Sequence, residues 1–321
     1  MDEVQSSGAV SSRRDKVGAT PGTMQRALVS GATGLIGSRL CATLEKPAVL
    51  SRNPKAAESK LGNVDAFAWD DAVPVPAAAV EGRSVMFHLA GDPVAHGRLD
   101  AEHKARVRES RVRGTRNVVE ALAHAKDGPK VLVCASASGI YGDRGDEVLR
   151  ESSAIGTDFL AEVCQAWEDE ARKAEAHGIR VVLLRIGIVL AKEGGALKQM
   201  LPPFRMGVGG VLGNGRQFMP WIHIDDILGL LKFAADTPEL RGPVNAVAPV
   251  QTTNQVFTTA LGRAIHRPTI FRVPAFALRV GFGDLARVVL ASQRVVPEVA
   301  LSAGYKFKHA DLDEALKDLL G

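Results

Sequence analysis

Short apolar runs recur along the chain between Arg26 and residue 190, without clean alternation with polar residues. Runs of this kind are typical of strands that a parallel sheet buries on both faces. We therefore expect core strands at "RALVS" (26–30), "AVLS" (48–51), "AFAW" (66–69), "VMFHLA" (85–90), "KVLVCAS" (130–136) and "RVVLLRIGIVL" (180–190).

Segments with helical character lie between several of these runs: "LIGSRLCATLE" (35–45), "DAEHKARVRESRVRGTRNVVEALAHA" (100–125) and "TDFLAEVCQAWEDEARKAEAHG" (157–178). Gly178 stands where the last one should stop. Strands that alternate with helices predict βαβ units and a parallel sheet. We expect an α/β fold: a Rossmann-type doubly wound domain over residues 24–190, to which residues 215–250 return, and a smaller C-terminal α/β lobe over residues 191–321.

Residues 1–23 are rich in Ser, Gly and Ala and contain almost no large apolar side chains. Such a segment cannot bury enough surface to order itself, so a disordered tail is predicted. It has no apolar region of the kind that a secretory signal needs. An organelle transit peptide is the alternative, and Asp2, Glu3 and Asp15 count against it.

Composition removes several classes of function. The 40 basic and 36 acidic residues are well mixed and aromatic residues are sparse, so we expect no nucleic-acid partner. No run of 18 uncharged apolar residues predicts a membrane span. Cys41, Cys134 and Cys164 are far apart and form no CxxC pair. We expect neither a disulfide framework nor a metal site, and a reducing, cytoplasmic location.

The stretch "VSGATGLIGSRL" has glycines at positions 31, 34 and 37, directly after the first predicted strand and at the start of the first helix. Glycines at this spacing permit a tight turn, close approach to a pyrophosphate and close helix–strand packing, and the helix N-terminus attracts phosphate. The alternative is a tight turn without a ligand. The predicted cofactor-binding set here is Gly31, Thr33, Gly34, Leu35, Ile36 and Gly37.

The end of the second strand bears on the choice of cofactor. An NAD site usually has an acidic residue there, which accepts a hydrogen bond from the ribose 2′-hydroxyl. This chain has Ser51 and Arg52 instead. A guanidinium pairs strongly with phosphate, so NADP(H) is predicted. The alternative is that Arg52 is a solvated loop residue.

Several motifs resemble those of a known family. "GATGLIG", "HLAG" (88–91), "SRVRGTRNVVEAL" (110–122) and "YGDRGDE" (141–147) resemble extended short-chain dehydrogenases/reductases. More narrowly, "DFLAEVCQAWE", "LPPFRMGVGGVLGNGRQFMPWIHIDD" and "ASQRVVP" resemble the "epimerase family" proteins, sometimes labelled sugar-nucleotide epimerases or SulA-type cell-division inhibitors. The likeness runs from about residue 26 to residue 320 and implies that NADP(H) lies between two lobes. It implies that Leu89 and Ala90 line the cofactor, that Arg111 contacts its phosphates or ribose, and that Val189 lies near the nicotinamide.

In the family that the chain resembles, a tyrosine transfers the proton and a lysine four residues later lowers the tyrosine pKa and holds the ribose. A serine about 25 residues earlier binds the substrate oxygen. Here Ser136, with Ser138 as the alternate, fits the serine position. The dyad positions fall near Phe159 and Val163, and neither side chain can transfer a proton.

Two other side chains are candidate proton donors. Tyr141 follows the fifth strand, where the carboxyl ends of the strands face the ligand crevice; alternatively, it only packs in its loop. His223 can act as acid or base near neutral pH; alternatively, it is a structural histidine beside Asp225 or Asp226, either of which would cap the helix "DDILGLLKFAA". The predicted catalytic set is Ser136, Tyr141 and His223.

Two charged features allow either a functional or a structural interpretation. Asp158 and Glu162 form a like-charged i, i+4 pair on the helix that lacks the dyad, which fits either a functional pair or a solvated face. The glycine-rich loop 207–217, with Arg205 and Arg216 near its ends, either clamps an anionic substrate or only connects parts of the second lobe.

Two functions fit these observations. The first is an NADP(H)-dependent oxidoreductase or epimerase that acts on a small carbonyl or sugar-like substrate with an altered proton donor. The second is a non-catalytic NADP(H)-binding sensor or scaffold, linked to cell division in the family's label. The retained polar side chains favour the first, and the missing dyad favours the second.

Overall fold

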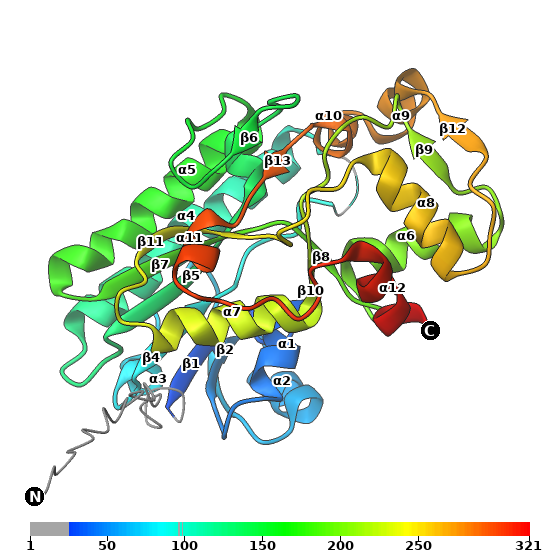
Figure 1. The fold of residues 1–321 in the computed structure, drawn as a ribbon. Helices are drawn as coiled ribbons and strands as arrows, with labels where there is room; N and C mark the ends of the chain where they lie inside the picture. Colours follow the sequence, from blue (N-terminus) through cyan, green and yellow to red (C-terminus); the bar gives the residue numbers. More distant parts are fainter. Residues whose placement is uncertain (1–25, 96, 98) are drawn as a thin grey trace, which may run out of the picture.

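The computed structural model describes residues 26–321 except residues 96 and 98. Its centre is a parallel seven-stranded sheet in the order β11-β7-β5-β4-β1-β2-β3 (Figure 1). The strands are β1 (Ala27–Ser30), β2 (Ala48–Ser51), β3 (Asp65–Ala68), β4 (Val85–His88), β5 (Val131–Ala137), β7 (Arg180–Ile186) and β11 (Gly242–Ala246). The order reverses at β1, which confirms the predicted Rossmann-type doubly wound class.

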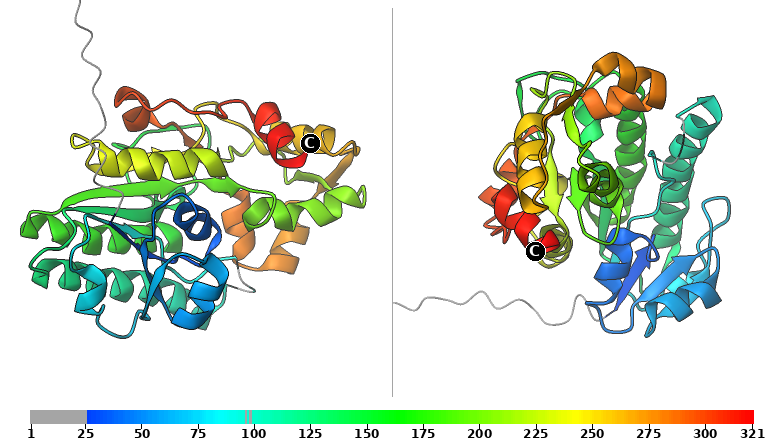
Figure 2. Two further views of the ribbon diagram at one scale, coloured as in Figure 1. Left: turned by 90° about the horizontal axis from the view of Figure 1, so that it is seen from below. Right: turned by 90° about the vertical axis from the view of Figure 1, so that its right-hand side faces the viewer.

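Helices cover both faces of the sheet, as the two views of Figure 2 show. One core cluster joins the sheet to α1 (Leu35–Cys41), α2 (Pro54–Leu61) and α7 (Ile224–Asp236), and the other joins it to α3 (Ala77–Val80), α4 (Ala101–His124) and α5 (Phe159–Arg172). Successive strand residues alternate between them. In β4, Val85 and Phe87 enter the first cluster and Met86 enters the second. Burial on both faces explains the continuous apolar runs in the sequence.

Helix ends follow local sequence signals at α5. Asp158 accepts a hydrogen bond from the Ala161 amide at 2.9 Å and so caps the helix start. The helix continues after Arg172 as the 3₁₀ segment η2 (Lys173–His177). It stops at Gly178, which takes the left-handed conformation with φ 74°. The predicted stop at Gly178 is confirmed, and Asp158 has a structural role as a cap.

The predicted strand over residues 180–190 is wrong as a single element. It breaks at Gly187 into β7 and β8 (Ile188–Leu190), because the chain there passes close to another segment. A Cβ at Gly187 would lie 2.5 Å from the Pro220 carbonyl oxygen. β8 leaves the main sheet and pairs with β10 (Trp221–His223). The break therefore leads the chain from the sheet into the second lobe.

The second lobe consists of short helices and paired short strands: α6 (Gly195–Arg205), β9 (Gly210–Leu212), α8 (Asn254–Ala264), β12 (Phe271–Val273), α9 (Ala275–Phe282), α10 (Leu285–Leu290) and α12 (Leu312–Leu320). β9 pairs with β12, and β13 (Arg294–Val295) pairs with β6 (Val148–Leu149), which follows β5. The chain returns to the main sheet at α7, β11 and α11 (Glu298–Ser302), which lie between segments of the second lobe in the sequence.

The predicted tail, residues 1–23, lies outside the described residues. In the described part of the chain, no helix is long and apolar enough to cross a membrane. All three cysteines are buried free thiols.

Candidate functional site

The glycine turn after β1 is built by close backbone contacts. Gly31 has φ 68°, and a Cβ there would lie 2.7 Å from the Leu89 carbonyl carbon. A Cβ at Gly37 would lie 2.3 Å from the Gly31 carbonyl oxygen. Both positions therefore exclude any side chain. Gly34 begins the helix in an extended conformation, φ −75° and ψ 178°, and its amide donates to the Gly31 carbonyl at 3.0 Å.

The start of α1 offers amide groups to an anion. No side chain caps Gly34, and the first turn of α1 carries no acidic residue. The first amides of a helix have no partner within the helix and attract phosphate. Thr33 and Gly34 are exposed on the turn, and Leu35 and Ile36 are partly exposed. This geometry fits a pyrophosphate.

Beside the glycine turn, the end of β2 carries positive charge. Ser51 makes a local turn with Asn53, in which its hydroxyl donates to the Asn53 carbonyl at 3.2 Å. Arg52 is exposed. Sequence reasoning missed Lys60, an exposed residue of α2 whose ammonium donates to the Thr33 carbonyl at 2.8 Å. Only the fold shows that Lys60 reaches the glycine turn, so no local signal could have found it.

A buried chain of hydrogen bonds shapes the turn after β4. The Ser30 hydroxyl accepts from the amides of Leu89 and Ala90 at 3.1 and 3.3 Å, so its own proton must go to His88 Nδ1 at 2.7 Å. His88 Nε2 therefore carries the ring proton and donates to Thr115 at 3.0 Å. Burial, with a smaller contribution from the Arg111 charge, lowers the pKa of His88 to about 4. Neutral His88 thus fixes the two residues predicted to line the cofactor.

The predicted catalytic residues Ser136 and Tyr141 are both buried, and each hydroxyl is hydrogen-bonded inside the protein. The Ser136 hydroxyl donates to Glu168 at 2.8 Å. Glu168 accepts two bonds from Arg185, at 2.8 and 2.9 Å, and both side chains are 4% exposed. Burial alone would lower the pKa of Arg185, but Glu168 raises it above its ordinary value. This ion pair needs both partners because either charge alone would be costly to bury.

Tyr141 closes the same network. Its side chain is 0% exposed, and its hydroxyl donates to Asn245 Oδ1 at 2.7 Å and accepts from Arg185 at 3.0 Å. Burial raises the pKa of Tyr141 above its ordinary value. The hydroxyl therefore has neither an exposed face nor the low pKa that a proton relay requires. This geometry favours the structural interpretation of Tyr141.

His223 caps α7, a role that the sequence had suggested for Asp225 or Asp226. Its Nδ1 accepts from the Asp225 amide at 3.1 Å, and Asp226 instead accepts from the amides of Lys308 and His309. The ring is 1% exposed and stacks on His309, with ring centroids 3.7 Å apart. Burial and then His309 lower the pKa of His223. These contacts make His223 a structural residue in this conformation.

His223, His309 and Asp318 are close enough together to raise the question of a metal, with ligand atoms within 4.8 Å of one another. Because Nδ1 of His223 accepts the cap hydrogen bond, Nε2 carries the ring proton. Nε2 lies 3.3 Å from Asp318 Oδ2 but makes no hydrogen bond within the described residues. A metal ion would need a lone pair on Nε2, which would move the ring proton to Nδ1 and break the cap on α7. The three side chains therefore do not fit a metal ion.

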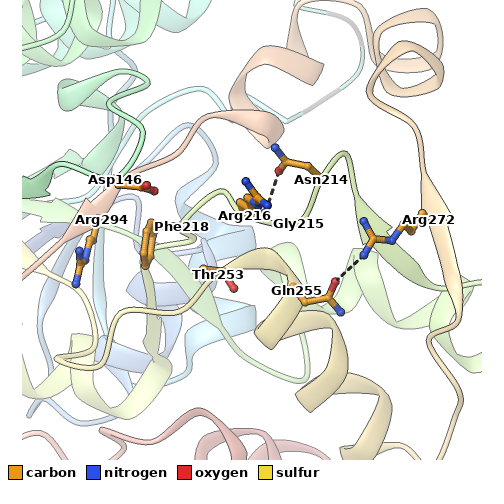
Figure 3. A pocket seen from close by; sticks show the side chains of 9 residues that line it. All are labelled: Asp146, Asn214, Gly215, Arg216, Phe218, Thr253, Gln255, Arg272 and Arg294. Atoms are coloured by element: carbon orange, nitrogen blue, oxygen red, sulfur yellow. Dashed lines mark hydrogen bonds between the residues drawn. The ribbon is translucent and has the colours of Figure 1, made fainter.

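A pocket of about 570 Å³ opens in the second lobe beside the carboxyl edge of the sheet (Figure 3). Three arginines from separate segments border it, and Asp146 is its single carboxylate. Arg294 lies over the Phe218 ring at 5.2 Å, and its Nε is buried without a hydrogen-bond partner in the described part of the chain. The lining residues are Asp146, Asn214, Gly215, Arg216, Phe218, Thr253, Gln255, Arg272 and Arg294. Positive charge exceeds negative charge here, so the pocket suits an anion.

A family model described as the NAD dependent epimerase/dehydratase family matches residues 27–247. The chain belongs to this family. A second model, a domain of unknown function (DUF1731), matches residues 273–319. Epimerase family protein Mb2239 of Mycobacterium bovis is 39% identical over 294 residues, which cover 90% of this chain and 95% of that protein. The resemblance inferred from the motifs is confirmed.

Two solved structures of similar proteins have the same fold. The human epimerase family protein SDR39U1, crystallised with NADPH, superposes with a TM-score of 0.82 at 31% identity and covers 92% of this chain and 99% of its own. A nucleoside-diphosphate sugar epimerase from Corynebacterium glutamicum superposes with a TM-score of 0.72 at 31% identity, covering 92% of this chain and 58% of its own.

Within this epimerase family chain, α5 presents an apolar surface where the dyad was sought. Leu160 packs on Gly139, two residues after the end of β5, and Phe159 lies toward α4, with Lys104 Nζ 5.5 Å from its ring. Val163 is buried. One turn after Leu160, burial raises the pKa of the Cys164 thiol to about 12. On α5, neither the predicted dyad positions nor Leu160 and Cys164 are a tyrosine or a lysine.

Proposed function

We propose that the protein binds NADP(H) across the carboxyl edge of the sheet. The glycine turn and the uncapped start of α1 provide a pyrophosphate cradle. Arg52 is exposed at the end of β2, and Lys60 adds a second positive charge beside the turn. These cations would pair more strongly with a 2′-phosphate than with the 2′-hydroxyl of NAD. The NADPH in the SDR39U1 structure supports the same choice.

We further propose an oxidoreductase or epimerase that acts on a small anionic carbonyl or sugar-like substrate. The arginine-lined pocket is the observation that carries this proposal. Its Asp146 comes from the loop between β5 and β6, so the pocket adjoins the edge of the sheet where the cofactor would react. The cytoplasmic location stays part of the proposal.

A non-catalytic NADP(H)-binding sensor or scaffold is the second candidate. One observation favours it: the hydroxyls of Ser136 and Tyr141 are both hydrogen-bonded within the buried network around Arg185. In this case ligand binding itself would be the function, and no turnover would accompany it.

Titration of NADPH and NADH, followed by ligand fluorescence, tests the cofactor assignment. We expect NADPH to bind at least about tenfold more tightly, since hydrogen bonds to charged groups contribute about 1.5–3 kcal/mol each. Arg52→Ala and Lys60→Ala should each weaken the binding of NADPH but not of NADH, and so reduce the difference between the two affinities. Arg150→Ala, which removes an exposed arginine paired with Glu298, is the control. Equal affinities for the wild-type protein would contradict the assignment.

A second experiment separates the two candidate functions. NADPH oxidation is followed with neutral ketones, with carboxylate- or phosphate-bearing carbonyls and with UDP-sugars, beside thermal shifts for the same compounds. We expect negligible turnover with the neutral ketones and with UDP-sugars. Turnover of an anionic carbonyl that is lost in Arg294→Gln supports the proposal that the protein is an enzyme. A thermal shift with an anion but no turnover supports the sensor, and no response to any anion refutes the proposal that the pocket binds an anion.

A further inference from the structure

Apolar side chains are left uncovered at the outer end of the second lobe. Among the described residues, six of the twelve large apolar side chains that are exposed lie between residues 270 and 289, and two more lie on the loop before β9. Clustered exposed apolar side chains mark sites of contact with a protein or a membrane. We call these eight the β12–α10 patch: Met206, Val208, Ile270, Phe271, Phe276, Val280, Val288 and Val289.

The strand pairing brings the segments of the patch together. β12 pairs with β9 in parallel, with Phe271 opposite Gly210. Ile270 therefore lies beside the loop 206–209, which precedes β9. α9 follows β12 directly and packs against α10, and both helices lie at the top of the molecule in Figure 1 and in the right-hand view of Figure 2.

Helix α9 turns an apolar face to the solvent. Leu278 is 5% exposed and packs inward, whereas Phe276 is 69% exposed and Val280 is 78% exposed. The two exposed residues are four positions apart, so they share one face of the helix. A helix of a globular protein normally packs such a face on the core. In the part of the chain that the structure describes, this face has no partner.

Positive charge accompanies the patch. The one acidic residue between positions 265 and 290, Asp284, is paired with Lys104 of α4. Within the described residues, no ion pair joins Arg279 or Arg287 to a carboxylate. The patch therefore carries charge of a single sign. The exposed arginines of this segment are Arg267, Arg272, Arg279 and Arg287.

This charge decides between the possible occupants of the patch. A symmetric dimer brings the same surface of both copies together, so the arginines of one copy would face those of the other. An anionic bilayer supplies what the patch lacks, because it offers phosphate groups to the guanidiniums and an acyl boundary to the apolar side chains. Helices that lie in the plane of a membrane surface need no spanning length.

We propose that the β12–α10 patch binds the surface of an anionic membrane. Phe276 and Val280 enter the boundary between headgroups and acyl chains, and the arginines of α9 and α10 contact the lipid phosphates. The attachment is peripheral and reversible, since two short helices bury little apolar area. It does not require NADP(H), because the patch lies outside the glycine turn and the end of β2.

Flotation of the full chain with lipid vesicles tests the proposal. One set of vesicles contains phosphatidylcholine alone, and the other contains equal parts of phosphatidylcholine and phosphatidylglycerol. We expect binding to the anionic vesicles that is at least about tenfold tighter than to the neutral ones and that weakens as sodium chloride is added. Phe276→Ser with Val280→Ser, and separately Arg279→Gln with Arg287→Gln, should each weaken this binding by about tenfold or more.

Two matched variants control for the chemical change. Val73→Ser with Leu301→Ser alters two exposed apolar residues elsewhere on the molecule, and Arg113→Gln with Arg150→Gln alters two exposed arginines. Both should bind vesicles as the wild type does. All four variants change exposed side chains, so each should melt within about 4 °C of the wild type, which shows that it is folded.

Equal binding to both kinds of vesicle, binding that survives in both patch variants, or no binding at all overturns the proposal. Sedimentation velocity of the same proteins tests for a second copy. A dimer that Phe276→Ser with Val280→Ser dissociates, without vesicle binding, assigns the patch to a second copy and overturns the membrane. Polyglutamate that binds as tightly as the anionic vesicles would show a general attraction for acidic chains, as in an acidic protein partner, and overturns the assignment to lipid.

Discussion

Replacing Tyr141 with phenylalanine separates a structural tyrosine from a catalytic one. The ring stays in place, and only the hydroxyl between Asn245 and Arg185 is removed. Arg185 Nη1 keeps a second bond, to the Glu151 carbonyl at 3.0 Å. Asn245 Oδ1 loses its donor in a fully buried site, while the Asn245 side-chain amide still donates to Val296. The loss is therefore concentrated on one acceptor.

An unsatisfied buried acceptor costs about 1–3 kcal/mol of the free energy of unfolding. For a chain somewhat larger than 250 residues, each kcal/mol lowers the melting temperature by roughly 2–4 °C. We expect Tyr141→Phe to melt about 2–12 °C below the wild type. The dissociation constant for NADPH should stay within about twofold, because the hydroxyl faces the network and not the glycine turn.

The assay is thermal unfolding beside NADPH titration and the substrate panel described above. Tyr305→Phe is the control, because it removes one hydrogen bond, to the Asp226 carbonyl, at a partly exposed site and should lower the melting temperature less. An unchanged melting temperature together with loss of turnover would refute the structural interpretation and identify Tyr141 as the proton donor.

Three further predictions concern the glycine turn, the buried His88 and the predicted N-terminal tail. Gly37→Val should abolish NADPH binding in titration, since even a Cβ would lie 2.3 Å from the Gly31 carbonyl oxygen; a variant that binds normally would contradict the proposed packing. Because His88 has a pKa of about 4 in the folded protein and about 6.5 when unfolded, the unfolded state alone takes up a proton as the pH falls between these values. The free energy of unfolding, measured with urea, should therefore be highest above pH 6.5 and fall by up to about 3 kcal/mol as the pH is lowered toward 4. His88→Asn should make the free energy of unfolding less dependent on pH in this range. A chain that starts at Met24 should keep its melting temperature and NADPH affinity, and a fall of several degrees would show that the tail packs on the body.

The parallel sheet could be predicted from sequence because its signals are local. Buried strands such as β2 and β4 need continuous apolar residues, and a tight turn into a helix needs glycine at positions 31 and 37. The break of the last run at Gly187 could not be predicted, because its cause is the Pro220 carbonyl, a distant backbone group. The local pattern alone predicts one continuous strand over residues 180–190.

The candidate site divides in the same way. Residue types alone exclude a tyrosine–lysine pair on α5 and place a cation, Arg52, after β2. Burial and partners, however, depend on which segments meet. Tyr141 is a plausible proton donor by position along the chain, but its partner Asn245 lies 104 residues away and occupies its hydroxyl. Likewise, His223 turned out to be a helix cap because its ring meets the Asp225 amide.

The sequence by itself determined the fold class, the glycine cradle and the absence of the usual proton relay, because each depends on residue type and spacing within one short segment. Only the tertiary structure decided which polar groups remain free to bind a ligand. Ser136, Glu168 and Arg185 satisfy one another inside the core, while Arg111 donates only from Nη1 in the part of the chain that the structure describes. A buried polar group is paired wherever the fold provides a partner, and that pairing joins residues far apart in the chain.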